Sequence, residues 1–112
     1  LGGVNPKLHH GTLNAVFLPA VIRFNATADS MQRDQRLQRI AQAIGLASGN
    51  DVAEAIRERN ARLGLPSGLA AMGVMRDLFA RIIDGALADH CHKTNPRIAT
   101  REDYRDMLAT SL

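Results

Sequence analysis

The segment from residue 11 to residue 24 constrains the fold more than any other part of this chain, because its apolar residues recur every three or four positions. This spacing places them on one face of an α-helix: Leu13, Val16, Phe17, Ala20, Val21 and Phe24. Ala15, Leu18 and Ile22 make the opposite side apolar, so we predict a helix that is buried nearly all round. Pro19 removes a backbone donor inside this segment, and the helix must either end or bend there. Because the apolar register continues in phase beyond Pro19, we predict a continuous, bent helix.

Four further segments show helical patterns. Inward apolar stripes predict helices over residues 31–44, 51–63 and 75–90, and Thr100 with Glu102 and Asp103 predicts the start of a last helix that reaches about Thr110. The side chains expected to face the core are Leu37, Ile40, Ala41, Ile44, Val52, Ile56, Leu63, Met75, Leu78, Phe79, Ile82, Ile83, Ala86 and Leu87. No alternation typical of a β-strand occurs. The predicted fold class is therefore all-α, with about five helices.

Composition limits the kind of protein that this chain can be. With 112 residues, 46% hydrophobic and 22% charged, it is sized for one small globular domain. Cys91 is the single cysteine, which excludes an internal disulfide and is compatible with a reducing cytoplasm. Arg23 and Asn25 close the longest apolar stretch before it reaches membrane-spanning length, so we expect no membrane partner.

The net charge of +3 raises the question of nucleic-acid binding. The arginines at positions 33, 36, 39, 57, 59 and 62 form two candidate basic patches, but Asp34, Asp51, Glu54 and Glu58 are interleaved with them. Tyr104 is the single tyrosine and tryptophan is absent, so a platform for stacking bases is missing. We expect solvated helix faces and no nucleic-acid partner.

Three motifs resemble those of one enzyme family. The long helix begins with His10-Gly11 and continues with Asn14-Ala15, Leu18-Pro19, Val21 and Phe24-Asn25. Leu1-Gly2-Gly3 precedes it, and Cys91-His92-Lys93-Thr94-Asn95-Pro96-Arg97 follows the segment 75–90. In this order and at about this spacing, the motifs resemble those of the iron-containing (group III) alcohol dehydrogenases. The resemblance implies the second half of the helical domain of a dehydroquinate-synthase-like fold.

The resemblance also implies a metal ligand at His10. Such enzymes hold one divalent metal, Fe²⁺ or Zn²⁺, with one Asp and three His side chains, and His10 matches the last of these. The other ligands would precede Leu1. Imidazole nitrogen suits either metal. The alternative ligand is His9, which stands where the family usually has Pro, but Gly11 anchors the match and favours His10.

The late motif implies two further roles. The resemblance places Cys91 where the chain passes the active-site cleft, so it could contact the substrate; the alternative is a small buried hydrophobe, the usual state of a free Cys. Asn95-Pro96 predicts a fixed turn that docks the last helix, with Arg97 paired to a carboxylate. His90 and His92 cannot chelate one ion from a helix, because residues two apart point in nearly opposite directions.

These matches imply that residues 1–112 are the C-terminal, metal-side part of a longer enzyme. No Gly-rich strand–turn–helix phosphate motif is present, so we expect the N-terminal nucleotide-binding domain to lie outside this sequence. The implied activity is metal-dependent interconversion of a small alcohol and an aldehyde or ketone with NAD or NADP, by a homo-oligomer, with residues 1–112 inactive alone. Alternatives are maleylacetate reductase of the same family and a free-standing helical binding module without catalysis.

Overall fold

The computed structural model describes residues 1–112, and it contains helices and no strand, which confirms the all-α fold. The α-helices are α1 (His10–Asn25), α2 (Asp29–Arg33), α3 (Arg36–Ala43), α4 (Val52–Arg62), α5 (Phe79–Ala88) and α6 (Arg101–Thr110). Short 3₁₀ helices are η1 (Gly49–Asp51), η2 (Ala70–Met72), η3 (Arg76–Leu78) and η4 (His90–Thr94). None of the helices has the length and apolar character that crossing a membrane requires.

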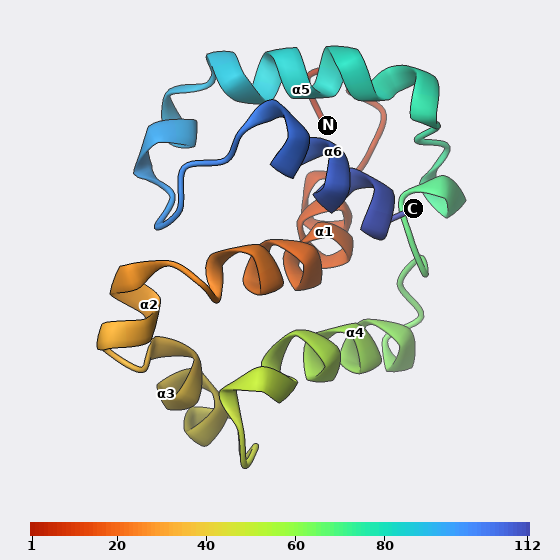
Figure 1. Cartoon of the computed structure of the whole chain (residues 1–112). Helices are drawn as coiled ribbons and strands as arrows, with labels where there is room; N and C mark the ends of the chain where they lie inside the picture. Colours follow the sequence, from red (N-terminus) through yellow and green to blue (C-terminus); the bar gives the residue numbers. More distant parts are fainter.

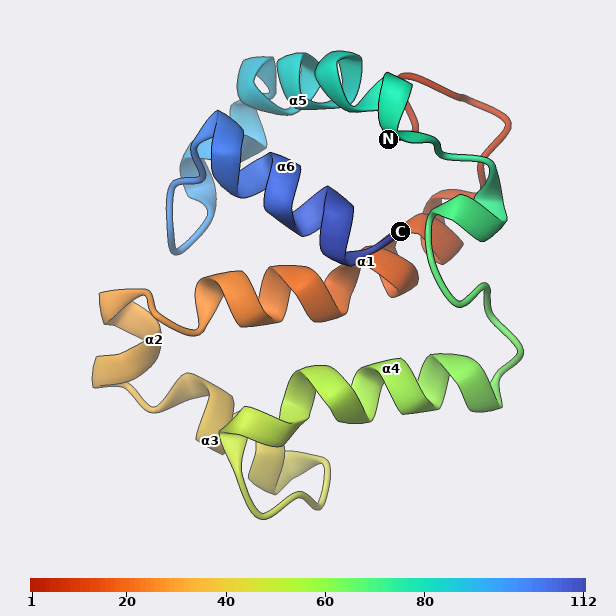
Figure 2. The same cartoon turned by 45° about the vertical axis from the view of Figure 1, so that its right-hand side comes forward.

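Four helices lie one above another in the order α5, α6, α1 and α4 (Figures 1 and 2). The short helices α2 and α3 connect α1 to α4 at one end of this stack. The molecule measures 38 × 32 × 19 Å, so it is little more than one helix layer thick. In consequence only 18 of its 112 residues are buried, and both broad faces are open.

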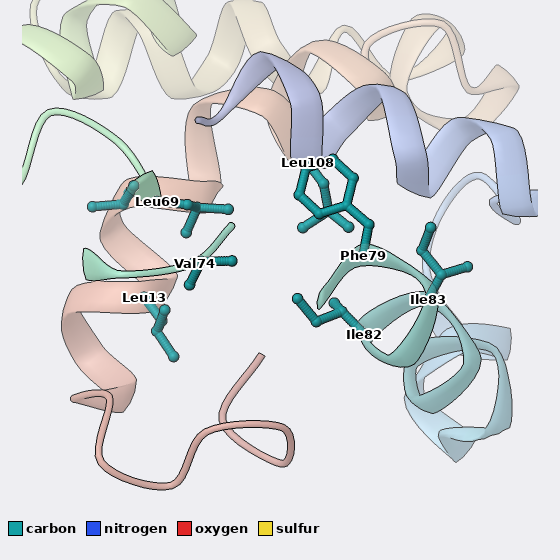
Figure 3. Close-up of a cluster of buried hydrophobic side chains, with 8 residues drawn as sticks. Leu13, Leu69, Val74, Phe79, Ile82, Ile83 and Leu108 are labelled. Atoms are coloured by element: carbon teal, nitrogen blue, oxygen red, sulfur yellow. The ribbon is translucent and has the colours of Figure 1, made fainter. Parts of the chain in front are cut away.

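The main core lies where α1, α5, α6 and the segment 69–74 meet (Figure 3). Leu69 and Val74 pack beside Leu13 of α1, while α5 and α6 supply Ile83 and Leu108. Each of these side chains is nearly inaccessible to solvent. Burying one side chain of this size stabilises the fold by about 1.5–3 kcal/mol. A second, smaller cluster of Ala20, Ala99 and Met107 joins α1 to α6.

The helix α1 is continuous through Pro19, as the sequence predicted. Pro19 has no N–H to donate to the carbonyl of Ala15, which would otherwise lack its helical partner. The side-chain amide of Asn60 in α4 donates to this carbonyl instead, with Nδ2 2.7 Å from the oxygen. The proline therefore creates the acceptor that ties α4 to α1.

The prediction that this first helix is buried nearly all round is wrong. The buried residues of α1 are Leu13, Val16, Pro19 and Ala20, whereas Leu18 is 42% exposed. Within this chain α1 packs mainly against α4 and α6 and contributes Leu13 and Val16 to the main core, and the side that bears Leu18 stays exposed.

The predicted single helix over 31–44 is also wrong, because α2 and α3 are separated by Gln35 in the left-handed conformation, with φ 48°. Residues 32–36 are all polar, so no buried contact opposes a break there. Asp34 binds Arg36 on the far side of the break, with 3.0 Å between Oδ2 and Nη2. Of the predicted stripe, Ala41 is buried, whereas Ile40 and Ile44 are exposed.

The other helices match their predicted segments with shorter ends. Val52 is buried in α4, but Leu63, expected to face the core, is 69% exposed just beyond its end. Met75 is exposed, and α5 begins at Phe79 and ends at Ala88 rather than at residue 90. The exposed members of each stripe lie on sides that no other element of this chain covers.

The last helix begins as predicted. Thr100 and Asp103 form a reciprocal cap, in which each side chain accepts from the other's backbone N–H. These hydrogen bonds from Thr100, together with the positive charge of Arg97, lower the pKa of Asp103 and keep it ionised. Arg97 in turn donates to Asp103, with Nη2 3.2 Å from Oδ1, which confirms the predicted carboxylate partner.

The turn at residues 95–97 fastens the end of α1 to the start of α6. Asn25 and Asn95 exchange side-chain amide hydrogen bonds of 3.1 and 2.7 Å. The guanidinium carbon of Arg97 lies 4.1 Å from the centre of the Phe24 ring, and its Nη1 donates to the Phe24 carbonyl at 3.4 Å. We call these residues, Phe24, Asn25, Asn95 and Arg97, the clasp. They confirm the predicted docking turn.

The bond from Asn60 to Ala15 gives a first prediction. Replacing Asn60 by Ala leaves the carbonyl without a protein donor and should lower the free energy of unfolding by about 1–2 kcal/mol. In a Pro19→Ala background, the restored N–H at position 19 can pair with Ala15, so the same Asn60→Ala change should cost less than about 0.5 kcal/mol. Denaturant unfolding of all four proteins measures the difference. Equal losses in both backgrounds would show that the two residues are not coupled.

The clasp gives a second prediction. Arg97→Ala removes a ring contact and three hydrogen bonds and should cost about 2 kcal/mol of stability. Arg97→Lys should recover less than half, because an ammonium cannot make the planar, forked contacts of a guanidinium. Arg101→Ala is the control: its pair with Asp84 is exposed and should be worth less than about 0.5 kcal/mol. Thermal unfolding of the three variants tests this order, and equal losses at positions 97 and 101 would contradict it.

Candidate functional site

One cavity of the molecule has a volume of about 750 Å³. It is enclosed by residues 1–4, α1, α5, η4 and α6, and most of its wall is apolar. Several polar side chains that sequence analysis singled out, and others that it did not, lie on this wall: His10, Asn14, Arg81, Asp89, Cys91, His92, Asn95 and Tyr104. An apolar cavity with a few convergent polar groups is the usual form of a small-molecule site.

His10 is the first residue of α1 and lies at the cavity wall. Its Nε2 is 3.0 Å from the amide nitrogen of Asn14, one turn further along the same helix. Because an amide NH₂ can only donate, Nε2 must be the unprotonated nitrogen of the ring. An unprotonated ring nitrogen is the form of histidine that binds a metal ion, and a metal at Nε2 would replace the hydrogen bond from Asn14.

His9 has a different task in the structure. It is the N-cap of α1, and its Nδ1 accepts from the backbone N–H and lies 3.2 Å from the hydroxyl of Thr12. The missing side chain at Gly11 leaves room for this ring, since a Cβ there would lie 3.2 Å from His9 Cε1. With Nδ1 accepting, the other nitrogen of a neutral ring carries the hydrogen. His9 does not line the cavity.

Cys91 lines the cavity and is exposed, so the alternative of a small buried hydrophobe is wrong for this chain. Its backbone N–H donates to Asp89 Oδ1 at 2.8 Å, which caps η4. A hydrogen bond of the Cys91 side chain with the Asp89 carboxylate raises the pKa of the Cys91 thiol. The hydrogen bond from the Cys91 backbone N–H lowers the pKa of Asp89. Cys91 is therefore a neutral thiol, suited to contact and not to nucleophilic attack.

The two histidines beside Cys91 have separate environments. The His90 side chain is 93% exposed, and its Nδ1 lies 3.6 Å from Asp89 Oδ1. Donor atoms of Asp89, His90 and Cys91 lie within 4.8 Å of one another, but all three residues are exposed. His92 is half-buried, and its Nδ1 is 3.0 Å from the hydroxyl of Tyr104 in α6. The two histidines thus form no common site.

The structure brings His10 and Cys91 to one cavity and leaves His9 outside it. Sequence reasoning missed His92, Tyr104 and Asp89. Tyr104 lies four residues, or about one helical turn, before the buried Leu108, so both face the same side of α6. This spacing could have indicated a partly buried phenol that needs a hydrogen-bond partner. Nothing in the sequence indicated that this partner would be His92.

Comparison with known proteins identifies the family of this chain. Residues 2–112 match the model of the Fe-containing alcohol dehydrogenase family, C-terminal part. No solved structure matches the chain. A 4-hydroxybutyrate dehydrogenase of Cupriavidus necator is 55% identical over 105 residues, which cover 94% of this chain and 28% of that protein.

More distant relatives are named for other alcohols and aldehydes. The NAD-dependent methanol dehydrogenase of Bacillus methanolicus is 32% identical over 100% of this chain and 30% of its own length. The lactaldehyde reductase of Escherichia coli K12 is 31% identical over 91% of this chain and 28% of its own length. The chain thus spans less than a third of the curated relatives it matches. Its motifs, fold and relatives together establish that it belongs to the iron-containing alcohol dehydrogenase family and corresponds to the C-terminal part of these enzymes.

Proposed function

We propose that this chain is the metal-side part of an oxidoreductase that interconverts a small alcohol and the matching aldehyde or ketone, with NAD or NADP. The observation that supports this most directly is the position of His10, which lines the cavity of about 750 Å³ and whose Nε2 is unprotonated. Cys91 lines the same cavity as a neutral thiol and is proposed to form part of the substrate wall.

The side chain of His10 fits the metal that the family implies. A neutral imidazole is a good ligand for both Fe²⁺ and Zn²⁺. When bound, such an ion polarises an alcohol oxygen and lowers its pKa, which favours loss of hydride from the carbon. Asn14 orients the ring of His10 while no metal is bound, and a metal at Nε2 would replace this hydrogen bond. Because one imidazole is an incomplete site, we infer that the other ligands precede this chain.

We further propose that residues 1–112 are the later part of a helical domain, with the nucleotide-binding domain preceding them. Several large apolar side chains are exposed, and we propose that the nucleotide-binding domain or a second copy of the protein packs against them: Leu18, Ile40, Ile44, Leu63, Met75 and Ile98. With one presumed ligand and no nucleotide-binding loop, residues 1–112 alone are proposed to be inactive. The exposed thiol of Cys91 is compatible with a cytoplasmic location.

We propose a substrate with a hydroxyl group at one end and a carboxylate at the other. The relative that shares 55% identity is named for 4-hydroxybutyrate, a molecule of this class. The similarity to it extends over 94% of this chain.

The assignment of the metal ligand can be tested in the full-length enzyme. His10→Asn should remove bound metal and lower NAD(P)-linked oxidation of 4-hydroxybutyrate by more than about 100-fold, since a missing ligand changes both affinity and geometry. His9→Asn is the matched control, because Asn is a good N-cap residue and preserves the start of α1. It should retain metal and most activity. Metal content by mass spectrometry and initial rates measure both effects.

The opposite pattern would overturn the assignment. If His9→Asn lost the metal and His10→Asn kept it, the ligand would be His9. If both variants kept metal and activity while the wild-type enzyme turned over, neither residue would be a ligand.

A further inference from the structure

His92 lines the cavity and is both partly buried and held by a second side chain. Its Nδ1 lies 3.0 Å from the hydroxyl oxygen of Tyr104, and the two ring centres are 5.8 Å apart at an angle of 43°. Tyr104 is itself partly buried in α6 beside the main core. The hydrogen bond with Tyr104 therefore orients the imidazole of His92 from α6, a helix that packs against the main core.

The hydrogen bond with Tyr104 also sets where the proton of His92 lies. Burial, followed by the negative charge of Asp89, raises the pKa of Tyr104, so the phenol remains protonated and can donate. When Tyr104 donates to Nδ1, the hydrogen of a neutral His92 is on Nε2. Nε2 makes no hydrogen bond to any group of the chain. His92, which lines the cavity, thus has an N–H donor that no group of the chain uses.

The remaining charged groups of the wall leave this donor available. The carboxylate of Asp89 accepts from the backbone N–H of Cys91 and lies near His90 Nδ1, and it keeps its negative charge on the cavity wall. Arg81 of α5 also lines the cavity, and no acidic group of the chain pairs with it. An anionic group in this cavity would therefore find the N–H donor of His92 and the guanidinium of Arg81, which together would offset the charge of Asp89.

We propose that His92, positioned by Tyr104, binds the carboxylate of the substrate and so selects hydroxycarboxylic acids over uncharged alcohols. The inference rests on the proposed function, in which the hydroxyl end of the substrate lies toward His10. A carboxylate that accepts from an oriented N–H forms a charge-assisted hydrogen bond, which is stronger than a bond between neutral groups. The adjacent His90, exposed and outside the cavity wall, has no part in this selection.

The test compares 4-hydroxybutyrate with 1-butanol in the full-length enzyme. These substrates share a four-carbon chain and a terminal hydroxyl group and differ in the carboxylate. His92→Leu should lower the ratio of kcat/KM for 4-hydroxybutyrate to that for 1-butanol by about 10- to 100-fold, mainly through KM for the acid. His92→Gln, whose amide nitrogen can reach the position of Nε2, should restore part of the ratio. His90→Leu is the matched control and should leave the ratio unchanged.

Tyr104→Phe separates positioning from general packing, because it keeps the ring and removes the hydroxyl. It should lower the same ratio by less than His92→Leu does, and it should have no further effect on the ratio when His92 is already Leu. Titration calorimetry of 4-hydroxybutyrate binding gives a readout that does not depend on turnover, and it should show weaker binding in His92→Leu than in His90→Leu.

The possible outcomes separate the role of His92 in binding the carboxylate from the proposed oxidoreductase function. Unchanged ratios and unchanged binding in His92→Leu would refute the role of His92, as would a loss of selectivity in Arg81→Gln with none in His92→Leu. A wild-type enzyme that binds 4-hydroxybutyrate through His92 but oxidises no alcohol would refute the proposed function and leave the role of His92 standing.

Discussion

The position of α1 is the constraint on which the rest of the structure depends. This helix is held in its middle by α4, where Pro19 leaves a carbonyl that Asn60 binds, and at its C-terminus by the clasp. Its N-terminus bears His10 at the cavity. Because the clasp also fixes the segment that follows η4, the same helix determines how the wall formed by Cys91 and His92 lies relative to His10.

Histidines that are close together in the sequence have different hydrogen-bond partners here, because their backbone positions differ. His9 caps α1 through Nδ1, whereas His10, the next residue, keeps Nε2 unprotonated at the cavity. His90 is in solvent, whereas His92 is held by Tyr104. In both pairs the helix start decides which ring turns inward. The cavity thus has a group suited to a metal and a separate group suited to an anion, which is the arrangement that oxidation of a hydroxycarboxylic acid would need.

Much of the fold could be predicted from the sequence, because helical apolar spacing and helix caps act locally. The continuity of α1 through Pro19, the cap at Thr100 and the turn at Arg97 all follow from such signals. The break at Gln35 and the exposure of Leu18 and Leu63 could not be predicted, because they depend on which surfaces lack a partner. The bonds from Asn60 to Ala15 and from Tyr104 to His92 join residues far apart in sequence, and no local pattern indicates them.

The central claim is that His10 is the ligand through which this chain takes part in catalysis. It is tested most directly by a crystal structure of the full-length enzyme grown with Fe²⁺, with anomalous scattering measured at the iron absorption edge. We expect one iron peak about 2.1 Å from Nε2 of His10, with His9 still capping α1 through Nδ1. An iron peak on His9, or on the exposed group of Asp89, His90 and Cys91 with none at His10, would contradict the account.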